Sequence, residues 1–268
     1  MTASHAVLFT MCLVTIFPVL WAVLTSLKPA NEIFSLDLMT SHSSLANYAE
    51  VYASIPFLRI MLNTIEVAVI LTVLTVGLSV CAAYALVLWN FPGKGIVFVL
   101  FAGSLLIPFQ VTMIPNYLMV ARLGWLNSMP GLIVPQLGST IGVGLGVFLL
   151  RQHFMNFPTE LCDAARIDGA GPIRLLWSVM LPNLRPALAA LSILIFLQAW
   201  NEYFWPLLVT KKSENSMIQV GLQLFLQAEG NAWGPLMAAA TMSMLPVFVV
   251  YFLAQRQIME AFVRSGVR

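Results

Sequence analysis

Long apolar runs dominate this chain and limit what it can fold into. Several of them reach the roughly 20 residues that a helix needs to cross the hydrocarbon core of a bilayer. Of the 268 residues, 60% are hydrophobic and 9% are charged, whereas about a quarter are charged in ordinary soluble domains. So few charged side chains cannot cover a water-facing surface. The chain is therefore predicted to lie in a membrane.

The apolar runs also select the type of spanning structure. In hydrocarbon, backbone polar groups must pair within the chain, which leaves helices or a closed barrel. The runs are continuous and lack period-two alternation, so they predict helices. We expect an all-α, polytopic membrane protein with a single domain over residues 1–268 and six transmembrane helices. Their predicted ranges are about 6–27, 60–89, 96–120, 132–150, 187–209 and 233–255.

Local signals add detail to these helices. The polar segment 28–58 predicts an external loop with a short interfacial helix at about 45–53. Pro108 and Pro115 predict a kinked helix within 96–120. Small residues at spacing four, namely Gly138, Gly142 and Gly146, predict close helix packing in lipid.

The distribution of basic residues predicts the orientation, because cytoplasmic loops carry more lysine and arginine. Six spans place both termini on one side. The segments on that side hold Lys94, Arg151, Arg166, Arg174, Arg185, Arg256, Arg264 and Arg268. The segments on the other side hold Lys28, Arg59, Arg122, Lys211 and Lys212. The N-terminus, the C-terminus and the polar segment 151–186 are therefore predicted to be cytoplasmic.

Segment 151–186 contains a pattern typical of two short helices. Pro158 suits the first helical position, and Glu160 puts a negative charge at the positive helix end. Gly169 is a predicted left-handed stop, because it lacks a Cβ. A second helix is expected to begin at Pro172 and to end before Pro182.

The first of these helices has a small, smooth face. Leu161, Ala164 and Ala165 share it by the i, i+3, i+4 rule, so another surface can approach closely. The charged residues around it are Asp163, Arg166 and Asp168. Two interpretations are open from composition alone: a docking surface, or a solvated hairpin that merely joins two membrane helices.

A longer pattern across this segment resembles a known motif. Asp163-Ala164-Ala165, three residues, Gly169, nine residues, Val179, one residue and Leu181-Pro182 resembles the EAA motif of bacterial ABC-importer permeases. In that family the motif is Glu-Ala-Ala, three residues, Gly, nine residues, Ile, one residue and Leu-Pro. Asp163 replaces the glutamate and Val179 the isoleucine, and every spacing matches.

The resemblance implies a type I importer permease of the MetI-like fold, in the maltose and glycerol-3-phosphate group. It implies that the motif forms a cytoplasmic coupling helix that docks into an ATPase subunit. The docking residues it implies are Glu160, Leu161, Asp163, Ala164, Ala165, Arg166, Asp168, Gly169, Leu181 and Pro182. The partners it implies are a homologous second permease, two ATPase subunits and an extracytoplasmic solute-binding protein, all in or at the bacterial cytoplasmic membrane.

Motifs for catalysis or cofactor binding do not occur in the sequence. There is no Gly-x-x-x-x-Gly-Lys-Ser/Thr phosphate loop, no His-Glu-x-x-His and no nucleophile elbow. The three cysteines have no metal-site or disulfide spacing, and the net charge of +2 does not favour nucleic acid. We expect a non-catalytic subunit without its own cofactor or metal, and ATP with Mg²⁺ in the partner ATPase.

A polar group within the fifth predicted helix is a candidate for solute contact. Trp200, Asn201, Glu202 and Tyr203 follow one another there. A carboxylate at membrane depth costs about 2.5–3.5 kcal/mol on insertion scales, so Glu202 is expected to face a cavity or a partner. Asparagine and glutamate bind sugar hydroxyls, and aromatic rings stack on sugars. The alternative is an interfacial aromatic belt with Glu202 reaching water.

Asn63 and Glu66 are weaker candidates of the same kind. They occur near the start of the second predicted helix. The alternative for them is a helix end at the external interface. The resemblance to importer permeases implies a permease that moves a sugar or sugar-like solute by alternating access, driven through segment 158–182. The rival classes are a secondary transporter or channel and a membrane-embedded enzyme.

Overall fold

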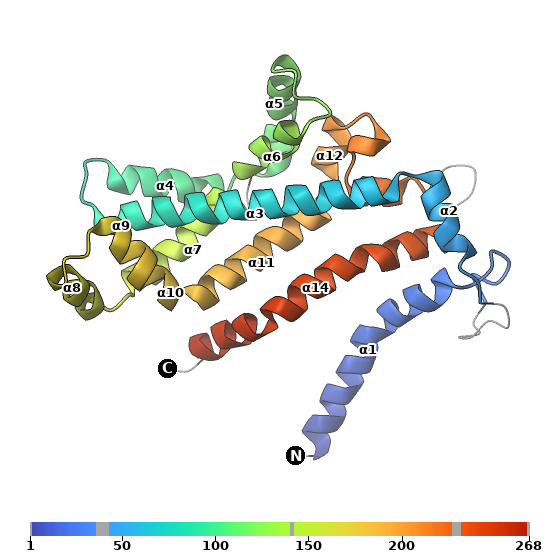
Figure 1. Ribbon diagram of the computed structural model, residues 1–268, viewed down its shortest axis with the longest axis horizontal. Helices are drawn as coiled ribbons and strands as arrows, with labels where there is room; N and C mark the ends of the chain where they lie inside the picture. The colour runs from blue at the N-terminus through green and yellow to red at the C-terminus, as the bar shows by residue number, and fades with distance from the viewer. Residues whose placement is uncertain (1, 36–42, 140–141, 227–231, 267–268) are drawn as a thin grey trace. The chain divides into compact units, whose positions relative to one another are not determined.

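The structure, a computed structural model, describes residues 2–35, 43–139, 142–226 and 232–266. Its regular elements within these ranges are helices, which confirms the all-α fold. Most of them are labelled in Figure 1; the longer ones follow. They are α1 (Thr2–Ser26), α2 (Ala46–Ser54), α3 (Phe57–Leu88), α4 (Lys94–Ser104), α5 (Phe109–Arg122), α6 (Met129–Leu137), α7 (Val143–Met155), α8 (Thr159–Ile167), α11 (Arg185–Asn201), α12 (Phe204–Val209), α13 (Ile218–Gln223) and α14 (Trp233–Gly266). The shortest are α9 (Pro172–Arg174), the π-helix η1 (Leu175–Met180), α10 (Leu181–Asn183) and the 3₁₀ turn η2 (Ser213–Asn215).

Two compact units make up the chain. The first comprises Met1–Thr64 with Lys212–Phe248, and the second comprises Ile65–Lys211 with Val249–Arg268. In the first unit, the buried amide of Asn47 donates to the carbonyls of Ser26 (2.8 Å) and Lys28 (2.9 Å). These bonds hold α2, the expected short helix near 45–53, to the end of α1.

Three described helices are long and apolar enough to cross a membrane. They are Ser4–Ser26, Phe57–Leu88 and Trp233–Gln257. Two bent helix pairs are further candidates: α4 with α5, at 97°, and the segment Pro172–Asn183 with α11, at 81°. Length and composition thus support three to five spans among the described residues. The number six stays a prediction.

The helix breaks fall inside three of the predicted spans. Range 96–120 breaks just before α5, where Pro108 has an extended backbone (ψ 136°). Pro115, by contrast, lies inside α5 without ending it. Range 132–150 is divided into α6 and α7, with Gly142 directly before α7, and range 187–209 is divided at Glu202, whose ψ is 125°. A run of apolar residues marks membrane-compatible chain, but it does not mark where the helical hydrogen bonds stop.

Two glycines of α7 lie in close contact with neighbouring helices of the second unit. A Cβ on Gly146 would collide with the side chain of Ser79 in α3. A Cβ on Gly144 would collide with Ser104 at the end of α4. Of the three glycines in the predicted pattern, only Gly146 lies within α7, since Gly138 and Gly142 flank the break. The close contact with α4 belongs to Gly144, outside that pattern.

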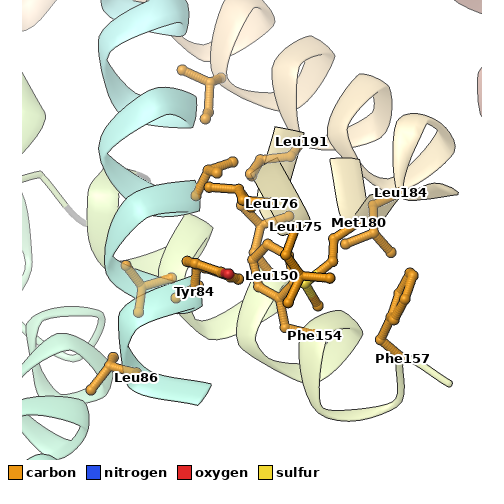
Figure 2. Close-up of a cluster of buried hydrophobic side chains, with 14 residues drawn as sticks. Tyr84, Leu86, Leu150, Phe154, Phe157, Leu175, Leu176, Met180, Leu184 and Leu191 are labelled. Carbon is orange, nitrogen blue, oxygen red and sulfur yellow. The ribbon is translucent and has the colours of Figure 1, made fainter. Parts of the chain in front are cut away.

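A cluster of buried side chains forms the core of the second unit (Figure 2). It joins the last turns of α3 to α7, to η1 and to the first half of α11. Its labelled members are Tyr84, Leu86, Leu150, Phe154, Phe157, Leu175, Leu176, Met180, Leu184 and Leu191. The cluster therefore connects a helix of membrane-spanning length with the segment that carries the motif.

Candidate functional site

Helix α8 is the central element of the motif segment. It begins at Thr159, and Pro158 precedes it with a non-helical ψ of 121°. Pro158 thus lies one position before the first helical residue expected for it. Glu160 lies in the first turn, where the helix dipole favours a negative charge.

The end of α8 is fixed by glycine. Gly169 has a φ of +78°, a left-handed conformation that costs a residue with a Cβ free energy. The N–H of Ala170 donates to the carbonyl of Ala165 at 2.9 Å, and that of Gly169 to Arg166 at 3.0 Å. This pair of bonds is a Schellman motif. The predicted helix stop at Gly169 is confirmed.

The segment after Gly171 departs from the sequence expectation. A helix begins at Pro172 as predicted, but it continues as η1 and α10 through Pro182 to Asn183. The expected end before Pro182 is wrong. A proline lacks an N–H and crowds the carbonyl four residues earlier. Ser178, four residues before Pro182, lies in the π-helix η1, whose wider i to i+5 turns relieve that conflict.

Helix α8 has an inward and an outward side. Cys162 and Ala165, three residues apart, pack against the core cluster. Leu161, 46% exposed, and Ala164 face outward. The predicted face of Leu161, Ala164 and Ala165 is therefore divided, because Ala165 is used to attach α8 to its own chain. Burial raises the pKa of the Cys162 thiol; nearby Arg166 lowers it and Asp163 raises it.

The polar residues of the motif segment are mostly exposed. The side chains of Glu160, Asp163, Arg166, Asp168 and Pro182 are exposed, and that of Leu181 is half-buried. The Arg166 guanidinium donates to the Asp163 carboxylate. A rigid helix thus presents both charge signs and a few apolar groups to the surroundings.

Three large apolar side chains on the same segment are also exposed, which the sequence reasoning did not anticipate. Ile167 is 87%, Ile173 76% and Trp177 64% exposed. Ile167 and Ile173 stand out in the sequence as apolar residues beside charged ones, whereas Trp177 lies within the mostly apolar run 175–181 and carries no such signal. Exposed apolar groups beside charges are typical of a surface that binds another protein.

A cavity of about 260 Å³ with several polar side chains lies elsewhere in the second unit. It is bordered by the ends of α5, α6, α11 and α12, and its lining residues are Pro108, Phe109, Gln110, Met113, Gln136, Ser139, Gln198, Glu202 and Phe204. The Oε1 atom of Gln198 is buried without a hydrogen-bond partner. Among the lining residues there is no lysine, arginine or histidine. The cavity therefore offers amide, hydroxyl and carboxylate groups beside aromatic rings.

The wall of this cavity is held by Trp205, which is completely buried. Its indole N–H donates to the carbonyl of Gly131 in α6 at 2.9 Å. Its ring meets that of Phe109 edge-on, with centroids 5.8 Å apart. The backbone N–H of Trp205 donates to the Glu202 carboxylate at 3.2 Å, so the predicted carboxylate also shapes the start of α12.

Of the residues predicted for the solute pathway, only Glu202 lines this cavity. Trp200 is buried and stacks on Phe196, with centroids 5.7 Å apart. The exposed Asn201 donates to the carbonyl of Leu197 at 2.7 Å. Tyr203 packs edge-on against Phe204. Gln110, Gln136 and Gln198 were missed because neutral amides far apart in sequence carry no motif.

Asn63 and Glu66 have different environments on α3. Asn63 is buried, and its amide donates to the carbonyls of Glu214 (2.8 Å) and Ser216 (3.1 Å). It thereby fixes the loop that precedes α13 within the first unit. Glu66 is exposed. Among the described residues, no group of three or more His, Cys, Asp or Glu side chains could hold a metal ion.

Apolar helices of spanning length, an exposed motif helix attached to the core and a cavity with polar side chains are typical of an integral membrane protein of the transporter class. The family model of the binding-protein-dependent transport system inner membrane component matches residues 5–262, and the chain belongs to this family. The resemblance to importer permeases is thereby confirmed. Members of this family are transport components, so the embedded enzyme and the secondary transporter are excluded as alternatives.

Curated relatives match nearly the whole chain. The sn-glycerol-3-phosphate transport system permease protein UgpE of Yersinia pestis bv. Antiqua (strain Antiqua) is 31% identical over 271 residues, covering 97% of this chain and 95% of the relative. The arabinooligosaccharides transport system permease protein AraQ of Bacillus subtilis (strain 168) is 30% identical, covering 96% and 92%.

Solved structures show the same fold. A chain of a bacterial ABC transporter involved in the import of the acidic polysaccharide alginate superposes with a TM-score of 0.79 and 23% identity, covering 96% of this chain and 95% of that one. A chain of a bacterial alginate ABC transporter, in complex with a periplasmic protein that binds an alginate pentasaccharide, has a TM-score of 0.60 and 17% identity, covering 94% and 93%.

Proposed function

We propose that this chain is the permease subunit of an ATP-driven importer of a sugar or sugar-like solute, and that it works by alternating access. Helix α8 carries the proposal. It is exposed on one side, packed on the core on the other and sharply ended at Gly169. A partner that binds such a helix can displace it, and the core contacts can transmit this displacement to the membrane helices.

The docking surface of the proposal is segment 158–182. Asp163 pairs with a basic group of the ATPase, Leu161 and Ala164 supply the packed face, and Gly169 permits the turn. The remaining contacts come from Glu160, Ala165, Arg166, Asp168, Leu181 and Pro182. ATP and Mg²⁺ are bound by the ATPase, and this chain holds no cofactor. The exposed Ile167 and Ile173 support a protein partner at this surface.

The rest of the proposed assembly follows the family. The partners are a homologous second permease, two ATPase subunits and an extracytoplasmic solute-binding protein. The chain lies in the bacterial cytoplasmic membrane as a multi-pass protein, with both termini and segment 158–182 in the cytoplasm. The basic residues counted above support this orientation.

The cavity at Gln198 and Glu202 supports a neutral, hydroxyl-rich solute. Amides donate to and accept from hydroxyl groups, and the lining includes the amides of Gln110, Gln136 and Gln198. A phosphate would lie near the Glu202 carboxylate with no lining cation to offset its charge. The N-terminus of α5 offers only about half a positive charge there. Of the solutes named for the two relatives, an arabinooligosaccharide therefore fits this cavity better than sn-glycerol 3-phosphate. Trp200, Asn201, Tyr203, Asn63 and Glu66 stay predicted pathway residues, with no support from this cavity.

Co-expression of the chain with the ATPase, second permease and binding protein encoded beside it tests the proposal. We expect the ATPase to stay bound in detergent, and proteoliposomes to take up an arabinose oligosaccharide only with ATP and binding protein. Loss of the ATPase from the purified wild-type complex would refute the docking surface.

Two variants address the cavity separately. Glu202→Ala and Gln198→Leu are expected to lower uptake while the ATPase stays bound. A Glu50→Ala variant is the control, since Glu50 is an exposed carboxylate outside the cavity lining. Unchanged uptake by both cavity variants would return Glu202 to the aromatic-belt interpretation. Uptake of sn-glycerol 3-phosphate in preference to the oligosaccharide would contradict the inference about charge.

A further inference from the structure

A hydrogen bond joins the end of α3 to the motif segment. The phenol hydroxyl of Tyr84 donates to the backbone carbonyl of Pro172 at 2.7 Å. Tyr84 is 5% exposed and lies one turn before the end of α3. Pro172 is the first residue of α9. A helix of membrane-spanning length is thus bonded directly to the segment that follows α8.

The Tyr84 ring is fixed by aromatic neighbours. It meets Phe154 of α7 edge-on, with centroids 5.8 Å apart, and Trp89 with centroids 6.3 Å apart. It also belongs to the core cluster shown in Figure 2. Since a tyrosine has few rotatable bonds and this one is buried between two other rings, its hydroxyl position follows the α3 backbone closely.

The carbonyl at the other end of the bond moves with α8. Only the connection 168–171 separates α8 from Pro172, and it is held by the Schellman bonds at Gly169. Cys162 and Ala165 attach α8 to the same core cluster that contains Tyr84. A displacement of α8 therefore reaches Pro172 over a short, bonded path.

We propose that Tyr84 is a positioning residue for energy coupling: its hydroxyl bond to Pro172 transmits displacement of segment 159–183 to α3. This inference rests on the proposed function, in which that segment docks the ATPase. The bond is not needed for α9 to form, because the N–H of Leu175 also donates to the Pro172 carbonyl. The hydroxyl can thus be removed without unfolding the segment.

The test is Tyr84→Phe in the complete importer, with uptake and ATP hydrolysis measured in the same proteoliposomes. The phenylalanine keeps the ring contacts and removes only the hydrogen bond. We expect uptake to fall about two- to tenfold, the range set by the net contribution of one hydrogen bond. The ATP hydrolysed per solute is expected to rise, while the amount of bound ATPase stays the same. Tyr251→Phe is the control, because Tyr251 is 51% exposed on α14.

Three outcomes would overturn the inference. The first is unchanged uptake and hydrolysis. The second is a fall of both by the same factor, which a general loss of active complex also produces. The third is loss of the ATPase from the Tyr84→Phe complex, which would make the hydroxyl a support for the docking surface. A wild-type complex that fails to retain its ATPase would instead refute the proposed function, so the two failures are distinguishable.

Discussion

The Nη1 atom of Arg166 lies 3.0 Å from Oδ1 of Asp163, one turn apart on α8. Both side chains are more than half exposed, at 54% and 63%. Exposed ion pairs contribute about 0–1 kcal/mol to stability. The carboxylate at the centre of the motif is thus not required for folding, and its function can be tested by substitution.

Replacing Asp163 is expected to stop transport and spare the fold. Asp163→Lys should abolish uptake, because it reverses the charge offered to the ATPase. It should change the free energy of unfolding by no more than about 1 kcal/mol. Uptake by cells and thermal unfolding in detergent measure the two effects. Arg166→Ala removes the ion pair but keeps the carboxylate, so it should retain more uptake. Normal transport by Asp163→Lys would contradict the coupling assignment.

The positive φ of Gly169 predicts a difference between two nearby glycines. A Cβ added at Gly169 or at Gly171 meets no atom within 4 Å, but only Gly169 is left-handed. Gly169→Ala should therefore cost about 1–2 kcal/mol through backbone strain and reduce uptake, whereas Gly171→Ala should be close to neutral. Unfolding in detergent together with uptake checks both. Equal effects of the two substitutions would show that the turn does not depend on the left-handed backbone.

The contact between Gly146 and Ser79 predicts an overpacking defect. Gly146→Ala puts a methyl group where the Ser79 side chain lies, which should destabilise the protein by about 1–3 kcal/mol. Gly77→Ala is the control in α3, where an added Cβ meets no atom within 4 Å. Thermal unfolding of detergent-solubilised protein distinguishes them. A Gly146→Ala variant as stable as Gly77→Ala would mean that α7 and α3 are not closely packed there.

Cysteine alkylation tests two predictions: the burial of Cys162 and the cytoplasmic location of segment 158–182. Burial raises the pKa of this thiol, so at a given pH less thiolate is present and labelling should need higher pH than for an ordinary thiol. A cysteine at position 167, by Ile167→Cys in a chain with its native cysteines replaced by alanine, is the exposed comparison. Maleimide should label it in inverted vesicles and not from outside intact cells. Labelling from outside would refute the cytoplasmic location.

Local chemistry explains which features could be predicted from sequence. The end of α8 needs only a glycine and backbone bonds within one turn, so Gly169 predicted it. The passage through Pro182 could not be predicted, since it depends on a π-helix held by the packing of Leu175, Leu176 and Met180. The motif residues were found because their spacing is fixed.

The cavity, by contrast, depends on residues far apart in the sequence. Gln110, Gln136 and Gln198 come from three separate helices and meet only through tertiary packing. Glu202 was found because a carboxylate in an apolar run is conspicuous. The helix break at Glu202 had a weak signal in the sequence. Glu202 precedes Trp205 by three residues, and its carboxylate accepts a hydrogen bond from the backbone N–H of Trp205.

The indole of Trp205 fastens three short helices from distant parts of the chain, since it bonds α6 and abuts α5 from within α12. Helices α6 and α12 cannot separate without leaving this buried N–H unpaired. Any widening of the Gln198 cavity must then move α6 and α12 together. The bending is left to the non-helical joints beside Pro108, Gly142 and Glu202.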